Sequence, residues 1–142
     1  MTYPSRRLSK LTEMQIVYVN KELKKQALYD LLMNTPPART LVFVRSKMTA
    51  DFVDDFLFNH GLPSTSIHAN RTQIEREDAL RAFKNGTAPI LVATGVSARG
   101  IDIKNVMHVI NFDLPSIEHN GEDEYIHRIG NILHLLSSLV FV

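Results

Sequence analysis

The stretch Pro89-Ile-Leu-Val-Ala-Thr-Gly-Val-Ser-Ala-Arg-Gly-Ile-Asp102 is an apolar run that ends in a polar loop. The run does not alternate apolar and polar residues, which is typical of a strand buried on both faces of a parallel sheet. In open α/β sheets, ligands bind beyond the carboxyl ends of the strands, where Thr94, Arg99 and Asp102 are expected. Two glycines allow the loop to turn sharply and to approach a phosphate closely. On these residues alone, a plain turn with ordinary surface charges remains the alternative.

Strands and helices are predicted to alternate along the rest of the chain. β-branched and aromatic residues indicate the strands, and apolar residues three or four apart indicate the helices. The predicted strands cover residues 14–19, 40–44, 65–68, 90–93 and 106–112. Alternation of this kind is typical of βαβ units with right-handed crossovers. The predicted fold class is therefore α/β, with a mainly parallel β-sheet flanked by helices.

Each predicted helix has an apolar face and a stop signal. The apolar faces are Leu23, Ala27 and Leu31, then Phe52, Val53, Phe56 and Leu57, then Ile74, Ala79, Leu80 and Phe83. The stops are Pro36-Pro37, Gly61 and Gly86. The third helix also has a start signal, because Thr72-Gln-Ile-Glu75 is a capping box, whose hydroxyl and carboxylate satisfy free amide groups of the first turn.

Composition sets limits on the class of function. The chain has 142 residues, 44% of them hydrophobic and 22% charged, which is typical of a single globular domain with a sizeable core. Its net charge of +1 excludes nucleic-acid binding by a general excess of cations, so such binding needs a local patch. The absence of cysteine excludes a disulfide framework and a thiolate metal site, and it fits a reducing compartment.

Targeting signals and metal motifs are not found in the sequence. The first 13 residues are polar and basic, which predicts a solvated arm and no secretory signal. No apolar run approaches the roughly 18 residues that a membrane-spanning helix needs. The histidines show no metal-ligand spacing with carboxylates, so no metal site is predicted.

Five segments resemble, in order, the motifs of the second RecA-like domain of the DEAD-box RNA helicases. Leu41-Val-Phe-Val-Arg-Ser-Lys47 resembles motif IV, Gln73-Ile-Glu-Arg76 has the spacing of motif IVa, and Val92 to Asp102 resembles motif V and its extension. Val109-Ile-Asn-Phe-Asp-Leu-Pro115 resembles the strand and turn that follow, and Tyr125-Ile-His-Arg-Ile-Gly130 resembles the first half of motif VI. The resemblance covers most of the chain and implies a three-layer RecA-like domain.

The resemblance implies that the domain binds single-stranded RNA through its sugar-phosphate backbone, without base-specific contacts. Such binding needs hydroxyl and guanidinium groups at strand ends and helix starts. The implied RNA contacts are Arg76, Thr94, Arg99 and Gly100, with Ser46 and Arg71 as secondary contacts. The simpler alternative for each arginine is a solvated surface charge.

Further residues are implied to face the nucleotide of the intact helicases, which hydrolyse ATP with magnesium. Asp102 is expected to bind the ribose hydroxyls of ATP. His127 and Arg128 are expected to line the cleft toward the first RecA-like domain, which is thereby an expected partner. A packed histidine and a surface arginine remain the alternative for these two residues.

Three departures from the family pattern affect these expectations. Ala69-Asn70 stands where the family has a glycine and an aspartate. Residues 116–124 form a longer and more acidic connection, predicted to be a surface loop. Asn131 and His134 replace the two arginines that the family directs toward the ATP phosphates.

The first RecA-like domain of the family is not found in this sequence. It has neither a Gly-x-x-x-x-Gly-Lys-Ser/Thr loop nor an Asp-Glu-Ala-Asp motif to bind phosphates and magnesium. The expected organisation is a linker-like arm over residues 1–13, a helicase domain over 14–130, and an apolar tail over 131–142 that departs from the family. The tail is predicted either to add a strand to the sheet edge or to stay exposed as an aggregation site.

The functional prediction is a weak single-stranded RNA-binding module of the cytoplasm or nucleus, without ATP hydrolysis of its own and without a membrane partner. A helicase cofactor protein is a further expected partner. The alternatives are a protein-interaction or inhibitory fragment and an inert fragment.

Overall fold

The computed structural model describes residues 13–17, 19–35, 38–98, 101, 106–113 and 137–141. In these residues, six strands form one sheet in the order β1-β6-β5-β2-β4-β3, and every neighbouring pair is parallel. The strands are β1 (Glu13–Val17), β2 (Thr40–Val44), β3 (Ser64–Ile67), β4 (Ile90–Thr94), β5 (His108–Asn111) and β6 (Ser137–Phe141). The predicted α/β fold with a parallel sheet is therefore confirmed.

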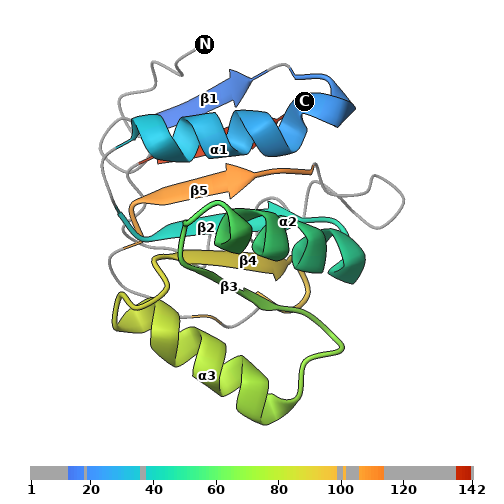
Figure 1. Cartoon of the computed structure of the whole chain (residues 1–142), viewed down its shortest axis with the longest axis vertical. Coiled ribbons are helices and arrows are strands. Elements are labelled where there is room, and N and C mark those ends of the chain that lie inside the picture. Colours follow the sequence, from blue (N-terminus) through green and yellow to red (C-terminus); the bar gives the residue numbers. More distant parts are fainter. Residues whose placement is uncertain are drawn as a thin grey trace.

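Within the described part of the chain, three α-helices cover the sheet. They are α1 (Lys24–Asn34), preceded by a 3₁₀ turn over Lys21–Leu23, α2 (Lys47–Asn59) and α3 (Gln73–Lys84). Figure 1 shows α1 and α2 in front of the sheet, whereas α3 lies at the end where β3 forms the edge. The core clusters place α1 and α2 on one face and α3 on the other, which makes three layers.

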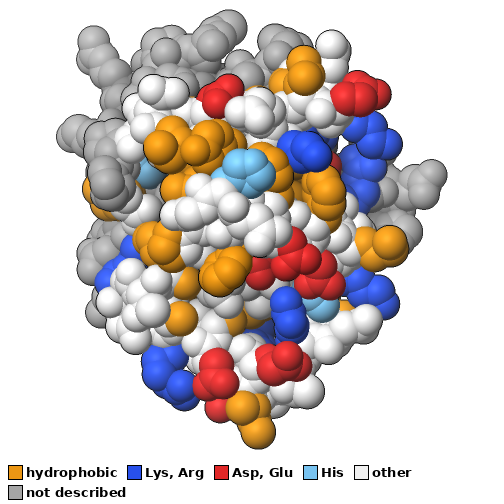
Figure 2. All heavy atoms as spheres, in the orientation of Figure 1, with side chains coloured by type: hydrophobic (Ala, Val, Ile, Leu, Met, Phe, Trp, Pro, Cys, Tyr) orange, Lys and Arg blue, Asp and Glu red, His pale blue; other side chains and the backbone are white. Residues whose placement is uncertain are grey.

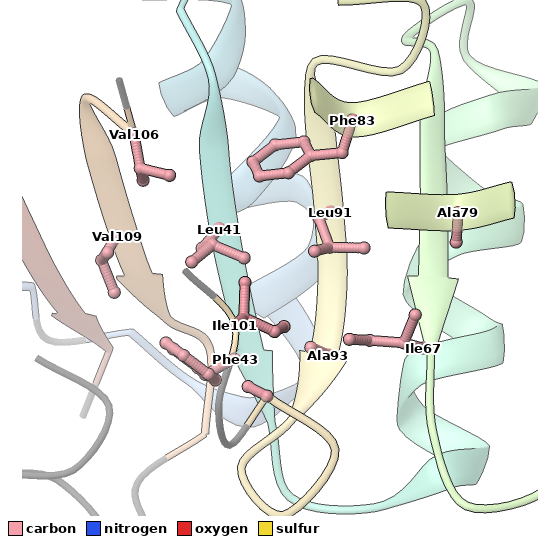
Figure 3. Packing of buried hydrophobic residues seen from close by; sticks show 11 residues of the cluster. Leu41, Phe43, Ile67, Ala79, Phe83, Leu91, Ala93, Ile101, Val106 and Val109 are labelled. Atoms are coloured by element: carbon pink, nitrogen blue, oxygen red, sulfur yellow. The ribbon is translucent and has the colours of Figure 1, made fainter. Parts of the chain in front are cut away.

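Strand β2 shows why the buried strands lack an alternating pattern. Leu41 and Phe43 point into the cluster under α3, whereas Val42 and Val44 point into the cluster under α1 and α2. Successive side chains of a strand point to opposite faces, so a strand covered on both faces needs apolar residues at every position. Figure 3 shows the α3-side cluster, in which Phe83 packs over Leu91.

The helix faces predicted from sequence are partly wrong. Ala79, Leu80 and Phe83 pack against the core as expected, but Ile74 is 72% exposed. A helix has 3.6 residues per turn, so Ile74 lies on the side of α3 opposite to these core residues. The predicted apolar face of α1 also differs from the observed one. Leu23 precedes α1 and is 55% exposed, whereas Leu28, which the prediction omitted, is fully buried.

One further deviation concerns the predicted apolar face of α2. Phe52 is exposed although its predicted neighbours Val53 and Leu57 are buried.

The predicted glycine stops are confirmed, since Gly61 and Gly86 adopt positive φ angles of +79° and +83° just beyond α2 and α3. Only glycine adopts this conformation without steric cost.

Residues 137–141 of the tail form a strand, but not at the edge of the sheet. Strand β6 lies between β1 and β5 and pairs in parallel with both. The prediction of an added edge strand is therefore wrong about its place, and β1 forms the edge instead. An apolar segment without charge or proline fits this interior place, because an interior strand hydrogen-bonds on both sides.

Candidate nucleic-acid interface

The candidate site lies at the edge of the sheet formed by the carboxyl ends of the strands. The arrowheads of β1, β2, β4 and β5 point to the same side in Figure 1. The register pairs Val44 of β2 with Thr94 of β4, and Phe43 with Asn111 of β5. The segments that follow β2, β4 and β5 therefore begin at one level and lie side by side, as expected for a ligand site in a parallel sheet.

Thr94 ends β4 and begins the loop that carries the predicted contacts. The backbone N–H of Ala98 donates to the carbonyl of Thr94 over 3.0 Å, which closes a turn. Ala98 and Ile101 are both 6% exposed and belong to the core cluster under α3. Figure 3 shows Ile101 lying over β2 and β4 between Leu41 and Phe43. The loop is thus anchored by a buried residue on either side of positions 99 and 100.

Arg76 connects helix α3 to this loop. Its Nη1 donates to the backbone carbonyl of Ser97 over 2.5 Å, and the side chain is half-buried. Arg76 lies one turn into α3, where the positive end of the helix dipole also favours an anion. Within the described residues, its remaining N–H groups and the Thr94 hydroxyl have no hydrogen-bond partner. Both side chains therefore keep donors available to a phosphate or a ribose.

Ser46 serves as the N-cap of α2. Its hydroxyl accepts from the backbone N–H of Thr49 over 3.2 Å and is hydrogen-bonded to the Thr49 hydroxyl over 2.9 Å. Serine is favoured at this position because it satisfies a free amide of the first turn. The side chain of Ser46 is exposed at the carboxyl end of β2, but its hydroxyl already has two partners.

Arg71 belongs to a polar network that we call the β3 clamp, formed by Asp51, Ser66, His68, Arg71 and Glu75. Its Nη2 donates to the Ser66 hydroxyl over 2.8 Å and to the Asp51 carboxylate over 3.2 Å. Its Nη1 lies 3.7 Å from the Glu75 carboxylate. Its Nε is buried without a partner among the described residues. The guanidinium therefore binds side chains of its own domain, which the sequence alone did not indicate.

His68 completes the β3 clamp and is almost fully buried. The backbone N–H of Asn70 donates to its Nδ1 over 3.2 Å, so the ring proton resides on Nε2, which donates to Asp51 over 2.8 Å. Asn70, at the first departure from the family pattern, also accepts from Lys47 Nζ over 3.4 Å. Asn70 thus connects the turn after β3 to the start of α2.

The capping box at the start of α3 is present as predicted. The Thr72 hydroxyl accepts from the Glu75 N–H over 3.1 Å, and the Glu75 carboxylate accepts from the Thr72 N–H over 2.9 Å. The pKa of Glu75 is lowered below its ordinary value of 4.5, mainly because its carboxylate accepts a hydrogen bond from the Thr72 backbone N–H. The same carboxylate thus faces both the helix start and Arg71.

Asp113 is a residue of this sheet edge that sequence reasoning missed. Its carboxylate accepts from the backbone N–H of Arg45 over 3.0 Å and from Lys24 Nζ over 3.2 Å. It therefore joins the end of β5 to the segment after β2 and to the start of α1. Its place directly after a buried strand was the available signal, but the two partners are 68 and 89 residues away in sequence.

Comparison with known proteins identifies the family. Residues 23–134 match the helicase conserved C-terminal domain. The chain is 33% identical to the DEAD-box protein SrmB of E. coli, solved bound to regulator of ribonuclease activity A, with a TM-score of 0.76 over 93% of this chain and 78% of that one. The chain belongs to the DEAD-box helicase C-terminal domains. Its parallel sheet and flanking helices are those of the RecA-like fold.

Two solved structures of S. cerevisiae Dbp5 are also similar to this helicase domain. Dbp5 bound to RNA and ADP BeF3 is 28% identical, with a TM-score of 0.83 over 94% of this chain and 36% of that one. The C-terminal domain of its L327V variant, bound to Gle1 H337R and IP6, is 29% identical, with a TM-score of 0.77 over 94% and 75%. The chain thus spans about a third of the longer helicase and most of a separate C-terminal domain.

Several predicted site residues of the helicase domain lie outside the described residues. They are Arg99, Gly100, Asp102, His127 and Arg128. Among the residues that are described, no three His, Cys, Asp or Glu side chains gather to hold a metal ion. No described helix is long and apolar enough to cross a membrane.

Proposed function

We propose that this helicase C-terminal domain binds single-stranded RNA weakly, through the sugar-phosphate backbone and without base preference. The observation that carries the proposal is the link between Arg76 and Ser97, which holds a guanidinium of α3 beside the loop after Thr94. Hydroxyl and guanidinium groups at one sheet edge suit phosphate and ribose oxygens. Support also comes from Dbp5, solved bound to RNA. The proposed contacts are Arg76, Thr94, Arg99 and Gly100, with Ser46 in a secondary role. Arg71, which the family resemblance implies as a further contact, is bound by Ser66 and Asp51 within the domain.

We expect weak binding because the net charge of the chain is only +1 and the proposed phosphate contacts are few. Figure 2 shows acidic and basic side chains interspersed on the α1–α2 face, without a large patch of one sign. Each phosphate contact with single-stranded nucleic acid contributes about 0.7 to the slope of log K against log salt, so a few contacts give a slope on the order of −1 to −3.

Titration of a fluorescent oligouridine at several salt concentrations tests the RNA proposal. Arg76→Ala is expected to weaken binding and to make the salt slope shallower by about 0.7. The matched control is Arg81→Ala, which removes an exposed arginine paired with Asp78 on the same helix and is expected to change neither quantity. Strong base preference, or equal effects of the two variants, would contradict the proposal.

In a complete helicase, we propose that the same domain contributes one wall of the ATP site. Asp102 would hold the ribose hydroxyls, and His127 and Arg128 would face the first RecA-like domain as the partner. Magnesium would bind that first domain, because phosphate-binding and magnesium-binding motifs are missing from this sequence. The absence of cysteine suits the reducing cytoplasm or nucleus.

We infer that the chain by itself does not hydrolyse ATP. Asn131 and His134 stand where the family has arginines, and an arginine finger contributes about 10³- to 10⁵-fold to the rate of phosphoryl transfer. Purified chain with RNA and magnesium-ATP is expected to show no turnover above buffer. RNA-stimulated turnover of a mixture with a separate first helicase domain, beyond that of the first domain alone, would show that the two arginines are dispensable.

A protein partner is the second candidate function. It is favoured by SrmB and the Dbp5 C-terminal domain, solved with regulator of ribonuclease activity A and with Gle1. Retention of a helicase cofactor protein on immobilised chain, undiminished by Arg76→Ala, would distinguish this function from RNA binding.

A further inference from the structure

The β3 clamp joins three elements of the domain through one arginine. Arg71 contacts Ser66 of β3, Asp51 of α2 and Glu75 of α3. A planar guanidinium suits this role because its donors form a rigid fork, which a lysine does not reproduce. The clamp therefore sets where the first turn of α3 lies relative to the edge strand and to α2.

The surroundings of Arg71 are unsuited to a direct phosphate contact. Both terminal nitrogens are directed at partners within the domain, and the side chain is only 31% exposed. Two carboxylates, of Asp51 and Glu75, flank the guanidinium. A phosphate that approached Arg71 would meet their like charge, which offsets the attraction of the cation. Among the described residues, Arg76 donates to the Ser97 carbonyl and has no flanking carboxylate of this kind.

The clamp is connected to the proposed RNA site by a short chain of contacts. Glu75, which Arg71 faces, immediately precedes Arg76 in the first turn of α3. Arg76 in turn donates to Ser97, in the loop that begins at Thr94. A shift of this first turn would therefore move Arg76 and withdraw its support from the loop.

We propose that Arg71 is a positioning residue: it determines RNA affinity by holding the first turn of α3 against the loop after β4, and it does not touch RNA. This inference rests on the proposed function, because Arg76 and the loop are the RNA contacts in that proposal. It assigns Arg71 a role different from the secondary RNA contact that the family resemblance implies.

Oligouridine titrations of Arg71→Gln, Arg71→Lys and Asp51→Asn test the inference, each at a temperature well below the unfolding midpoint of the variant. All three variants are expected to weaken binding roughly 2- to 30-fold, the range for residues that act on a site without contacting its ligand. Their salt slopes are expected to match that of the unsubstituted chain, because no phosphate contact is lost. Arg81→Gln is the control and is expected to leave affinity unchanged.

A direct phosphate contact predicts a different pattern and would overturn the inference. In that case Arg71→Lys retains most of the affinity because it retains the charge, and Arg71→Gln makes the slope shallower by about 0.7. Asp51→Asn then strengthens binding, since it removes a competing carboxylate. The sign of the Asp51→Asn effect therefore separates the two models even if Arg71→Gln does not fold.

Amide hydrogen exchange without RNA provides the readout that is independent of the proposed function. Arg71→Gln is expected to speed exchange at Glu75 and Arg76, whose N–H groups donate to Thr72, and at Ala98, whose N–H closes the turn after Thr94. Unchanged exchange there would overturn the inference while leaving the RNA proposal intact. Absence of oligouridine binding by the unsubstituted chain would instead overturn the RNA proposal, and exchange would still decide whether Arg71 positions the turn.

Discussion

The loop after β4 and the turn after β3 lie on neighbouring strands at the same sheet edge, but they are held by different forces. Ala98 and Ile101 anchor the loop by burial in the core. The turn is held by hydrogen bonds and ion pairs, chiefly those of His68 and Arg71 with Asp51. Apolar burial is non-directional and depends on area, whereas a polar anchor depends on particular partners and on their charge. The two segments should therefore respond differently to substitution, salt and pH.

The largest expected effect comes from the apolar anchor. Ile101→Ala should lower the free energy of unfolding by about 2–5 kcal/mol, because it leaves a cavity beneath the loop. Urea denaturation measures this loss, which should be the same at low and high salt. Val96→Ala is the matched control, since Val96 lies exposed in the same loop and should change stability by less than about 0.5 kcal/mol. Equal effects of the two changes would show that burial does not anchor the loop.

A smaller effect is expected from the polar anchor. Asp51→Ala should cost about 1–3 kcal/mol, because it leaves the buried Nε2–H of His68 without its acceptor. Asp55→Ala, an exposed carboxylate on the same helix, serves as the control and should cost less than about 0.5 kcal/mol. A loss as small as that of the control would mean that water replaces Asp51 fully and that the turn is not held by this contact.

The next largest loss of stability is expected at the start of α3. Thr72→Ala removes the hydroxyl of the capping box and should cost about 1 kcal/mol. Thermal unfolding measures the loss, and Thr72→Ser should restore most of the stability because serine caps equally well. If serine fails to restore stability, the methyl group of Thr72 rather than its hydroxyl is responsible.

The smallest expected effect is a dependence of the free energy of unfolding on pH. The folded-state pKa of Glu75 is lowered below 4.5, chiefly by the hydrogen bond from the Thr72 N–H. A lowered folded pKa stabilises the fold above the unfolded value of about 4.5, and this contribution is lost as pH falls through the lowered pKa. Glu75→Gln should flatten the stability profile below pH 4.5, and an unchanged profile would contradict this assignment.

Some parts of the fold and site could be predicted because their cause is local. A capping box needs only the spacing of Thr72 and Glu75, and it is present as expected. The apolar run of β4 indicated burial on both faces, and four of its five residues are buried. Other parts were mispredicted because a helix face depends on the angle between residues as well as on their spacing. Ile74 was predicted on the apolar face of α3, yet it lies on the side opposite to Ala79 and Phe83 and is exposed.

The local sequence decided the element order, the parallel α/β class and the loop that follows Thr94, because strand periodicity, caps and glycine turns act over a few residues. Only the tertiary structure decided that β6 enters the sheet between β1 and β5, and that Arg71 faces Asp51 instead of solvent. Asp51 lies 20 residues from Arg71 on another element, so their contact exists only once α2 and β3 have packed. An arginine in a motif has the same chemistry whether it binds a phosphate or a neighbouring carboxylate, and the choice depends on which group folding places beside it.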